Sequence, residues 1–233
     1  MDFTTLDDNL ARVREEIALA QAVEGLNGEV RIVAVTKGHP LAAVEAALES
    51  GLKEVGENRI QEAMAKQDEA TALEGVVWHL IGHLQTNKAK YVPGRFALVH
   101  SVDSVRVAES LGKAQAKLEQ PQEPLGVLVQ VNVAKEEQKN GCAPEEADEV
   151  ASCVVDTPGL ALRGLMTMAP FDIDEVEQRS VFSKLRRLKE DLAQEGFELP
   201  ELSMGMSSDF RAAVAEGATI LRLGTVLFGK RGA

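Results

Sequence analysis

RIVAVTK, residues 31–37, is the stretch that decides the fold of this chain. Its centre is an unbroken run of apolar residues, which is typical of a parallel strand covered on both faces and not of a strand with one face in water. The turn sequence Gly38-His39-Pro40 follows at once, and Pro40 opens the helical pattern LAAVEAALES, which Gly51 ends. A strand, a turn and a helix in this order form the repeating unit of an α/β protein.

The same unit recurs along the whole chain. Apolar runs return about every 27 residues, which fits one strand, one helix and two short loops. Helical patterns follow Asn58, Ser104, Pro144 and Asp172. We therefore predict a (β/α)8 TIM barrel with an extra N-terminal helix near residues 3–24, and an open doubly wound sheet is the second architecture. The predicted strands cover residues 31–37, 53–58, 76–84, 96–103, 125–134, 160–169, 201–207 and 219–229.

Composition narrows the classes of function. The chain has 233 residues with a net charge of −12, so neither a nucleic acid nor an anionic membrane is an expected partner. There is neither a secretory signal nor an apolar run of about 18 residues, and we expect a cytoplasmic protein. Cys142 and Cys153 match no disulfide framework or zinc motif. No proline- or glycine-rich linker divides the chain, so we expect one domain over residues 1–233, and the charge together with the lack of an apolar surface stripe predicts a monomer.

Lys37 is the first candidate for chemistry. It ends the first predicted strand, and functional residues of a barrel lie at the carboxyl ends of its strands. A partly desolvated lysine loses preference for the ammonium form, and its free amine attacks carbonyl groups. The alternative is a lysine that extends from a strand end into water.

A second candidate site is carried by the last two predicted strands, and the loops after these two strands often build the phosphate site of a barrel. The two segments are Met204–Ser208 and Arg222–Thr225, which combine hydroxyl groups, glycine backbone amides and one arginine. If Asp209 begins the next helix, its charge repels phosphate, so we expect an anion nearer the hydroxyls. The alternative is that Ser207 or Ser208 only caps that helix.

Other polar residues carry weaker signals. His79 and His83 lie four residues apart within one predicted strand, and a hydrogen-bonded barrel histidine is favoured over a metal ligand. Asn132 lies at the end of another predicted strand. The polar segment 135–140 is expected to be an exposed loop. The alternative is a loop that closes over the barrel mouth.

Six segments, taken together and in order, resemble the pyridoxal phosphate homeostasis proteins (the YggS/PROSC family). The resemblance covers nearly the whole chain, so it is far more specific than any one motif. The segments are VAVTKGHP (33–40), VGENRIQEA (55–63), WHLIGHLQTNKAK (78–90), QVNVAKEEQKNG (130–141), RGLMTMAP (163–170) and LSMGMSSDFRAAVAEGATILRLGTVLFGKR (202–231).

The resemblance implies a fold similar to the N-terminal domain of alanine racemase, with pyridoxal 5′-phosphate (PLP) held as a Schiff base on Lys37. It also implies that Arg222 faces the pyridine nitrogen and that Asn58 lies beside the ring. His83 and Asn132 have no assigned contact with the ring. The expected cofactor-binding residues are Lys37, Asn58, Ser203, Met206, Ser207, Arg222, Gly224 and Thr225.

The expected function is that of a PLP carrier and buffer in vitamin B6 homeostasis, without catalytic turnover and with transient contact to PLP-requiring apoenzymes. One alternative is a small PLP-dependent amino-acid racemase, which needs an acid or base on each face of the substrate. The chain has one tyrosine, Tyr91, after the third predicted strand. The other alternative is a cofactor-free Schiff-base aldolase.

Overall fold

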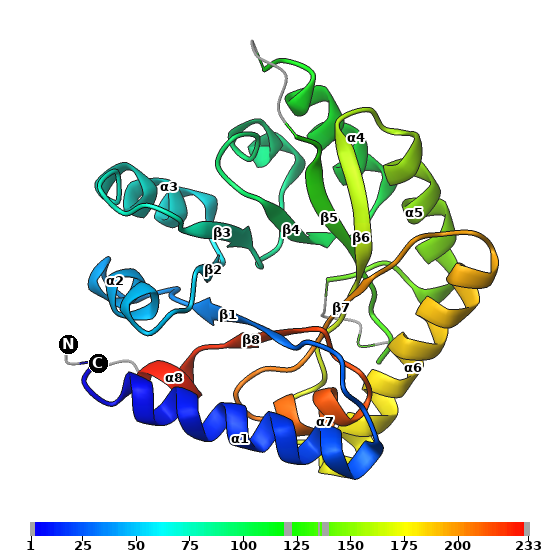
Figure 1. Cartoon of the computed structure of the whole chain (residues 1–233). Helices are drawn as coiled ribbons and strands as arrows, with labels where there is room; N and C mark the ends of the chain where they lie inside the picture. The colour runs from blue at the N-terminus through cyan, green and yellow to red at the C-terminus, as the bar shows by residue number, and fades with distance from the viewer. Residues whose placement is uncertain (1–2, 119–122, 135, 137–139, 231–233) are drawn as a thin grey trace.

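The computed structural model describes residues 3–118, 123–134, 136 and 140–230, and it shows a closed barrel of eight parallel strands surrounded by helices (Figure 1). The strands are β1 (Arg31–Val35), β2 (Glu54–Glu57), β3 (Val77–Leu80), β4 (Leu98–Val102), β5 (Leu125–Gln130), β6 (Leu160–Met166), β7 (Glu201–Ser203) and β8 (Ile220–Leu223). Each strand pairs with the next one along the chain, and β8 pairs with β1 to close the barrel. The predicted (β/α)8 fold is therefore confirmed.

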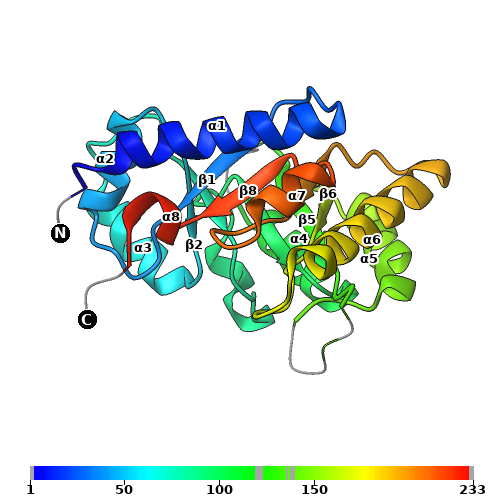
Figure 2. The same ribbon diagram turned by 90° about the horizontal axis from the view of Figure 1, so that it is seen from below.

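The helices lie outside the strands. They are α1 (Leu6–Glu24), α2 (Ala42–Glu49), α3 (Ile60–Glu69), α4 (Val105–Gln115), α5 (Ala147–Asp156), α6 (Glu175–Gln194), α7 (Phe210–Ala215) and α8 (Thr225–Phe228), with two 3-10 helices, η1 (Thr86–Tyr91) and η2 (Pro144–Glu146). The extra N-terminal helix α1 packs beside α7 and α8 (Figure 2). Among the described residues, no helix has the length and apolar character needed to cross a bilayer.

The apolar residues of the strands fill two separate spaces because neighbouring side chains point to opposite faces of a strand. In β1, Val33 belongs to the small cluster inside the barrel, and Ala34 belongs to the large cluster between strands and helices. Both residues are fully buried. This explains the unbroken apolar run in the sequence, because neither face of a barrel strand meets water. The interior cluster is Val33, Leu98, Leu128, Met166 and Ile220.

Several predicted boundaries were wrong, chiefly because apolar loop residues at the rim resemble strand residues. The eighth strand was predicted to extend to residue 229, but it ends at Leu223, and α8 follows with its buried residue Leu227. The third, fifth and seventh strands also end earlier than predicted, at Leu80, Gln130 and Ser203. The helix predicted directly after Asp172 begins later, at Glu175. Asp174 caps it through a hydrogen bond of 2.9 Å from the amide of Glu177.

Candidate functional site

Lys37 lies in the turn that follows β1, at the carboxyl end of the barrel. The strand ends at Val35, Thr36 is fully buried, and Lys37 itself is half-buried. The amide of His39 donates to the carbonyl of Thr36 at 3.0 Å and closes the turn. Lys37 is therefore a half-buried lysine at the mouth of the barrel, the end at which barrel proteins place residues that react with a ligand.

A buried ion pair holds the residue before Lys37 in place. The ammonium of Lys66 in α3 donates to the Glu57 carboxylate at 2.6 Å and to the Thr36 carbonyl at 2.8 Å. The Thr36 hydroxyl also donates to Glu57, at 2.6 Å. Burial raises the pKa of Glu57, and its hydrogen bonds with Lys66 and Thr36 act in the opposite direction. The cluster fixes the backbone before Lys37 at the end of β2.

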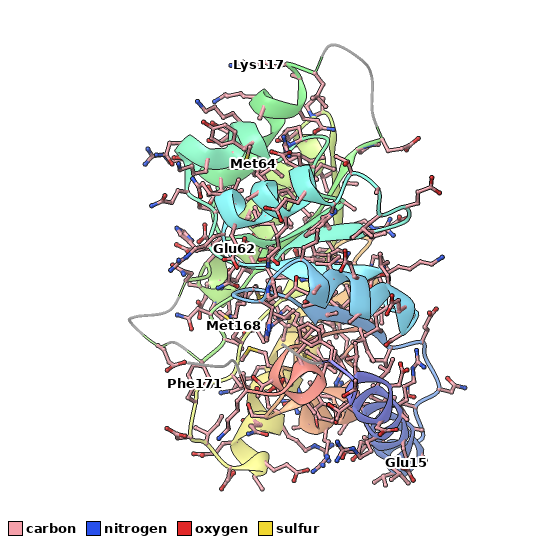
Figure 3. All side chains as sticks on the ribbon, turned by 90° about the vertical axis from the view of Figure 1, so that its left-hand side faces the viewer. Glu15, Glu62, Met64, Lys117, Met168 and Phe171 are labelled. Atoms are coloured by element: carbon pink, nitrogen blue, oxygen red, sulfur yellow. The ribbon has the colours of Figure 1, made fainter. Side chains whose placement is uncertain are left out.

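The backbone after Lys37 is held from the same helix. The amide of Gly38 donates to the Glu62 carboxylate at 2.5 Å, and Lys66 lies 3.5 Å from that carboxylate. Figure 3 shows Glu62 of α3 on the same side of the molecule as Met168, which follows β6. The lysine turn is therefore fixed from both ends, so the Lys37 side chain starts from a defined position.

The segments after β7 and β8 meet at the hydroxyl of Ser207. This oxygen accepts hydrogen bonds from the amides of Gly224, at 3.3 Å, and Val226, at 3.1 Å. Two backbone N–H groups thus converge on one oxygen, which is the arrangement that suits an anion. A cavity of about 310 Å³ lies beside Ser207 and Val226, and its lining includes the basic residue Arg211 and the acidic residues Glu16, Glu175 and Asp209. Ser207 therefore does not act as a simple cap of α7, which was the alternative interpretation.

Asp209 is the N-cap residue of α7 and directly precedes Phe210, the first residue of that helix. It is buried, and its carboxylate accepts a hydrogen bond of 2.5 Å from the amide of Met206. Gly205, in the same segment, has φ of +95°, and an added Cβ would lie 2.6 Å from the Cβ of Ala213. A glycine is therefore required where the chain turns from β7 toward Ser207.

Arg222 of β8 points into the barrel and not toward solvent. Its guanidinium donates to the Ser203 hydroxyl at 2.6 Å and to the Thr167 carbonyl at 2.9 Å. Burial lowers the pKa of Arg222 to about 10, and the negative charge of Asp209 acts against this shift. Arg222 therefore remains charged at neutral pH. Ser203 is fully buried beneath it, so its hydroxyl supports Arg222 and is not at the surface of the site.

The remaining expected residues surround the same mouth with different exposure. Asn58 follows β2 and is exposed, Met206 is half-buried, and Thr225 is exposed at the start of α8. The side chain of Asn132 is engaged locally, because it donates to the carbonyl of Glu136 at 2.8 Å. The segment 135–140 lies largely outside the described residues, so its expected loop has no structural test.

The two histidines of the third predicted strand have separate environments. His79 is buried in β3 and is hydrogen-bonded to another histidine, which agrees with the interpretation as a barrel histidine. His83 lies beyond the strand end and is exposed. Its ring nitrogen lies 3.3 Å from the carboxylate of Asp103.

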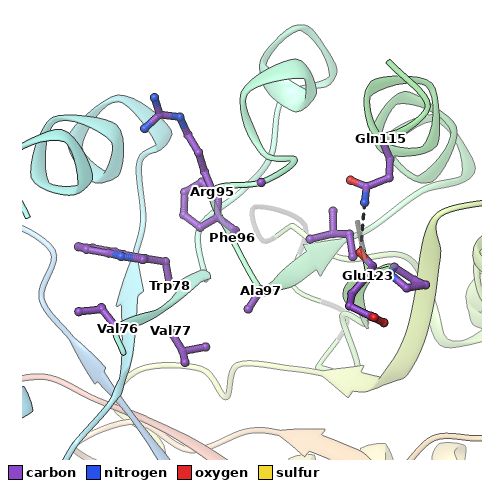
Figure 4. A pocket seen from close by; sticks show the side chains of 11 residues that line it. Val76, Val77, Trp78, Arg95, Phe96, Ala97, Gln115 and Glu123 are labelled. Carbon is purple, nitrogen blue, oxygen red and sulfur yellow. Dashed lines mark hydrogen bonds between the residues drawn. The ribbon is translucent and has the colours of Figure 1, made fainter. Parts of the chain in front are cut away.

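A larger hollow lies at the opposite end of the barrel, next to the amino ends of β3, β4 and β5 (Figure 4). It has a volume of about 610 Å³, and Trp78, Phe96 and Gln115 are among the residues that line it. Gln115 donates to the carbonyl of Glu123 at 3.4 Å. Residues at this end of a barrel serve stability, whereas chemistry belongs to the carboxyl end. The Lys37 end is therefore the candidate site.

Known proteins with related sequences bear directly on this site. "Pyridoxal phosphate homeostasis protein" of Pseudomonas aeruginosa is 42% identical over 229 residues, which are 98% of this chain and 96% of the relative. The protein of the same description from Aquifex aeolicus is 40% identical, over 96% of this chain and 97% of the relative. The chain belongs to the pyridoxal phosphate homeostasis protein family. The family relationship predicted from the six sequence segments is confirmed.

Structures of known proteins agree with this family. PipY of Synechococcus elongatus, solved with PLP bound, is 37% identical, with a TM-score of 0.83 over 96% of this chain and 100% of its own. The profile described as "Alanine racemase, N-terminal domain" matches residues 8–232. Alanine racemase of Clostridium difficile is only 15% identical, with a TM-score of 0.72 over 97% of this chain and 58% of its own, and shows a shared fold alone.

Four residues that contact the expected site residues or their neighbours were not predicted from the sequence. Glu57 and Lys66 form the ion pair beside Thr36, the residue before Lys37. The Thr167 carbonyl accepts from Arg222, and the His100 ring contacts Ser203. None of the four belongs to a recognisable motif. One signal was present: Glu57 is a carboxylate that ends a buried strand, and a buried charge needs a partner. The partner Lys66 comes from the following helix, and only the packing of α3 on β2 reveals it.

Proposed function

We propose that this chain binds PLP at the carboxyl end of its barrel and acts as a carrier and buffer in vitamin B6 homeostasis. One observation carries the proposal. The lysine turn after β1 and the Gly224 segment after β8 lie at the ends of neighbouring strands, since β1 pairs with β8 and an added Cβ on Gly224 would lie 3.4 Å from the Val35 carbonyl. The amide of Gly224 in turn donates to the hydroxyl of Ser207, which follows β7. The relatives named as homeostasis proteins and the PLP bound by PipY support the same conclusion.

The residues present fit the chemistry of PLP. A phosphate needs converging donors, and the amides of Gly224 and Val226 already converge on the Ser207 oxygen. An aldehyde needs an amine that is not fully solvated, and Lys37 is half-buried. A pyridine nitrogen accepts one hydrogen bond, which the charged and buried guanidinium of Arg222 is suited to donate.

Lys37 is the residue that we propose holds the cofactor covalently. PLP supplies an aldehyde, and the neutral amine of Lys37 would form a C=N bond with its carbon while the oxygen leaves as water. The bonds from Lys66 to Thr36 and from Gly38 to Glu62 keep the lysine turn in one position. Asn58, Met206 and Thr225 complete the proposed contacts around the mouth, and Ser203 takes part through Arg222.

We propose that the protein does not turn over amino acids. An arginine at the pyridine nitrogen keeps that nitrogen unprotonated, which weakens the electron sink that PLP enzymes use. The tyrosine of the chain, Tyr91, is exposed at the end of η1, with the ammonium groups of Lys88 and Lys90 at 5.9 and 5.0 Å from its ring centre. It is therefore already engaged at the surface.

A titration of the purified protein with PLP tests the binding proposal. The wild type should develop the visible absorption band of a lysine-bound pyridoxyl group, and Lys37→Ala should not. Lys53→Ala is a matched control, because Lys53 is an exposed lysine at the amino end of β2. Absence of the band in a folded wild-type protein would refute the binding proposal.

Incubation with D- and L-amino acids tests the non-enzymatic role. We expect neither inversion of configuration nor exchange of the α-hydrogen in deuterated buffer, and loaded protein should restore activity to a PLP-requiring apoenzyme. Turnover at about 1 s⁻¹ or faster would show a racemase instead.

We also propose that the protein is a single-domain monomer that works in the cytoplasm. Sedimentation equilibrium tests the oligomeric state.

A further inference from the structure

A row of polar side chains crosses the otherwise apolar interior of the barrel. His79 pairs in register with Leu98, which precedes His100 by two residues, and Arg222 pairs with Val33. Leu98 and Val33 belong to the interior cluster, so these polar residues face the same interior. Ser203 lies between His100 and Arg222, and Glu54 lies at the other end of the row, near the amino end of β2.

The members of the row are in direct contact. The Nδ1 atom of His79 lies 3.0 Å from Nε2 of His100, and Nδ1 of His100 lies 2.8 Å from the hydroxyl of Ser203. The Nη1 group of Arg222 donates to the same hydroxyl at 2.6 Å. At the far end, Nε2 of His79 lies 3.6 Å from a carboxylate oxygen of Glu54. His100 and Ser203 are fully buried, so hydrogen bonds with water are not an alternative for them.

The two ends of the row and the burial of Ser203 together set the direction of its bonds. A guanidinium only donates, so the Ser203 oxygen accepts from Arg222. A buried hydroxyl also needs an acceptor for its own hydrogen, and among the described residues Nδ1 of His100 is the neighbour that offers one. His100 then carries its proton on Nε2 and donates to Nδ1 of His79. His79 also carries its proton on Nε2, which faces a carboxylate oxygen of Glu54. Burial raises the pKa of Glu54, and the guanidinium of Arg31, 3.3 Å from its other oxygen, acts in the opposite direction and favours the carboxylate. The opposite direction would place the bare nitrogen of His79 against that carboxylate.

This arrangement requires both rings to be neutral, because a ring that donates on one side and accepts on the other has one proton. Burial lowers the pKa of His79 to about 3, and the positive charge of Arg31 acts in the same direction. Burial also lowers the pKa of His100 to well below its ordinary value, and Arg222 and Arg31 add to this shift. Both histidines are therefore neutral at neutral pH.

We propose that His100, supported by His79, is a positioning residue for Arg222, and that both rings carry their proton on Nε2. His100 orients the Ser203 hydroxyl so that its lone pair faces Nη1 of Arg222, while the Thr167 carbonyl holds Nη2. The guanidinium is thereby held from two sides. The consequence for the cofactor rests on the proposed function, in which Arg222 faces the pyridine nitrogen of PLP.

Nitrogen NMR of the cofactor-free protein, labelled with ¹⁵N-histidine, tests the proton positions without reference to PLP. We expect the Nε2–H form for His79 and His100, with no titration between about pH 5 and 8. His79→Gln and His100→Gln assign the signals. A proton on Nδ1 of His100, or titration of either buried ring in this range, would overturn the proposal.

PLP binding by variants tests the positioning role. His100→Leu should raise the dissociation constant about tenfold, the effect that loss of an outer-shell partner has on a metal site, and should shift the visible band of the bound cofactor. Val150→Ala in α5 is a control for general destabilisation, because Val150 is buried outside the barrel interior. It should change neither quantity.

The outcomes separate the two proposals. A wild type that binds PLP, together with a His100→Leu variant that binds equally well with the same band, would refute the positioning role alone. A wild type that binds no PLP refutes the proposed function, and the proton positions measured by NMR then decide the inference. The same NMR measurement decides it if His100→Leu does not fold.

Discussion

Acid should destabilise this protein through the two histidines inside the barrel, and His79 allows the size of the effect to be calculated. Its pKa is about 3 in the folded protein, against an ordinary value of 6.5. Between these values the unfolded chain binds a proton that the folded protein excludes. The free energy of unfolding therefore falls as the pH falls through this window. From pH 7 to pH 5 the contribution of His79 is about 2 kcal/mol, and its limit below pH 3 is about 5 kcal/mol.

The variant His79→Gln isolates this contribution, because glutamine retains a donor and an acceptor but does not titrate. Urea unfolding followed by circular dichroism gives the free energy at pH 7, 6 and 5. The loss between pH 7 and pH 5 should be about 2 kcal/mol smaller in the variant than in the wild type. His83→Gln makes the same substitution at an exposed histidine and is measured alongside as the matched control. Equal losses in wild type and His79→Gln would refute the reasoning.

Three further substitutions have expected outcomes. Gly205→Ala should lower the free energy of unfolding by about 2 kcal/mol or more, since φ is +95° and the added Cβ would lie 2.6 Å from Ala213. Gly28 has open space around it, so Gly28→Ala should change the free energy of unfolding little in the same urea experiment. Phe182→Ala should lower it by about 3–5 kcal/mol, because the ring is fully buried, and a loss below about 1 kcal/mol would contradict this packing. Ser207→Ala should weaken PLP binding about tenfold in equilibrium dialysis, and unchanged binding would place the phosphate elsewhere.

The sequence was sufficient for the fold because barrel strands have no exposed face. Segments such as residues 32–35 are apolar throughout, and the return of this pattern at a nearly constant interval predicted the barrel. The predicted positions of the strand ends were less accurate than the fold. In the eighth predicted strand, the apolar residues of α8 continue the pattern of β8 after a break of only Gly224 and Thr225. Gly224 stands at that break, and a glycine alone does not tell a turn from a strand interior.

The candidate site was partly predictable for a related reason. Lys37 and Ser207 are the last residues of predicted strands, so the barrel places them at one end without further information. Gly224 lay inside the eighth predicted strand, and only the actual end of β8 at Leu223 places it at the same end. The partners of those residues depend on register and packing. His79 was considered beside His83, four residues away, but its partner is His100 on the next strand, which only the pairing of β3 with β4 reveals.

The central claim is that the amine of Lys37 holds the aldehyde of PLP, and borohydride reduction followed by mass spectrometry tests it most directly. The protein is loaded with PLP, reduced, digested and mapped by peptide. We predict one pyridoxyl group, on the peptide that contains Lys37, and its loss in Lys37→Ala but not in Lys53→Ala. A pyridoxyl group on Lys66 or another lysine, with Lys37 unmodified, would contradict the account.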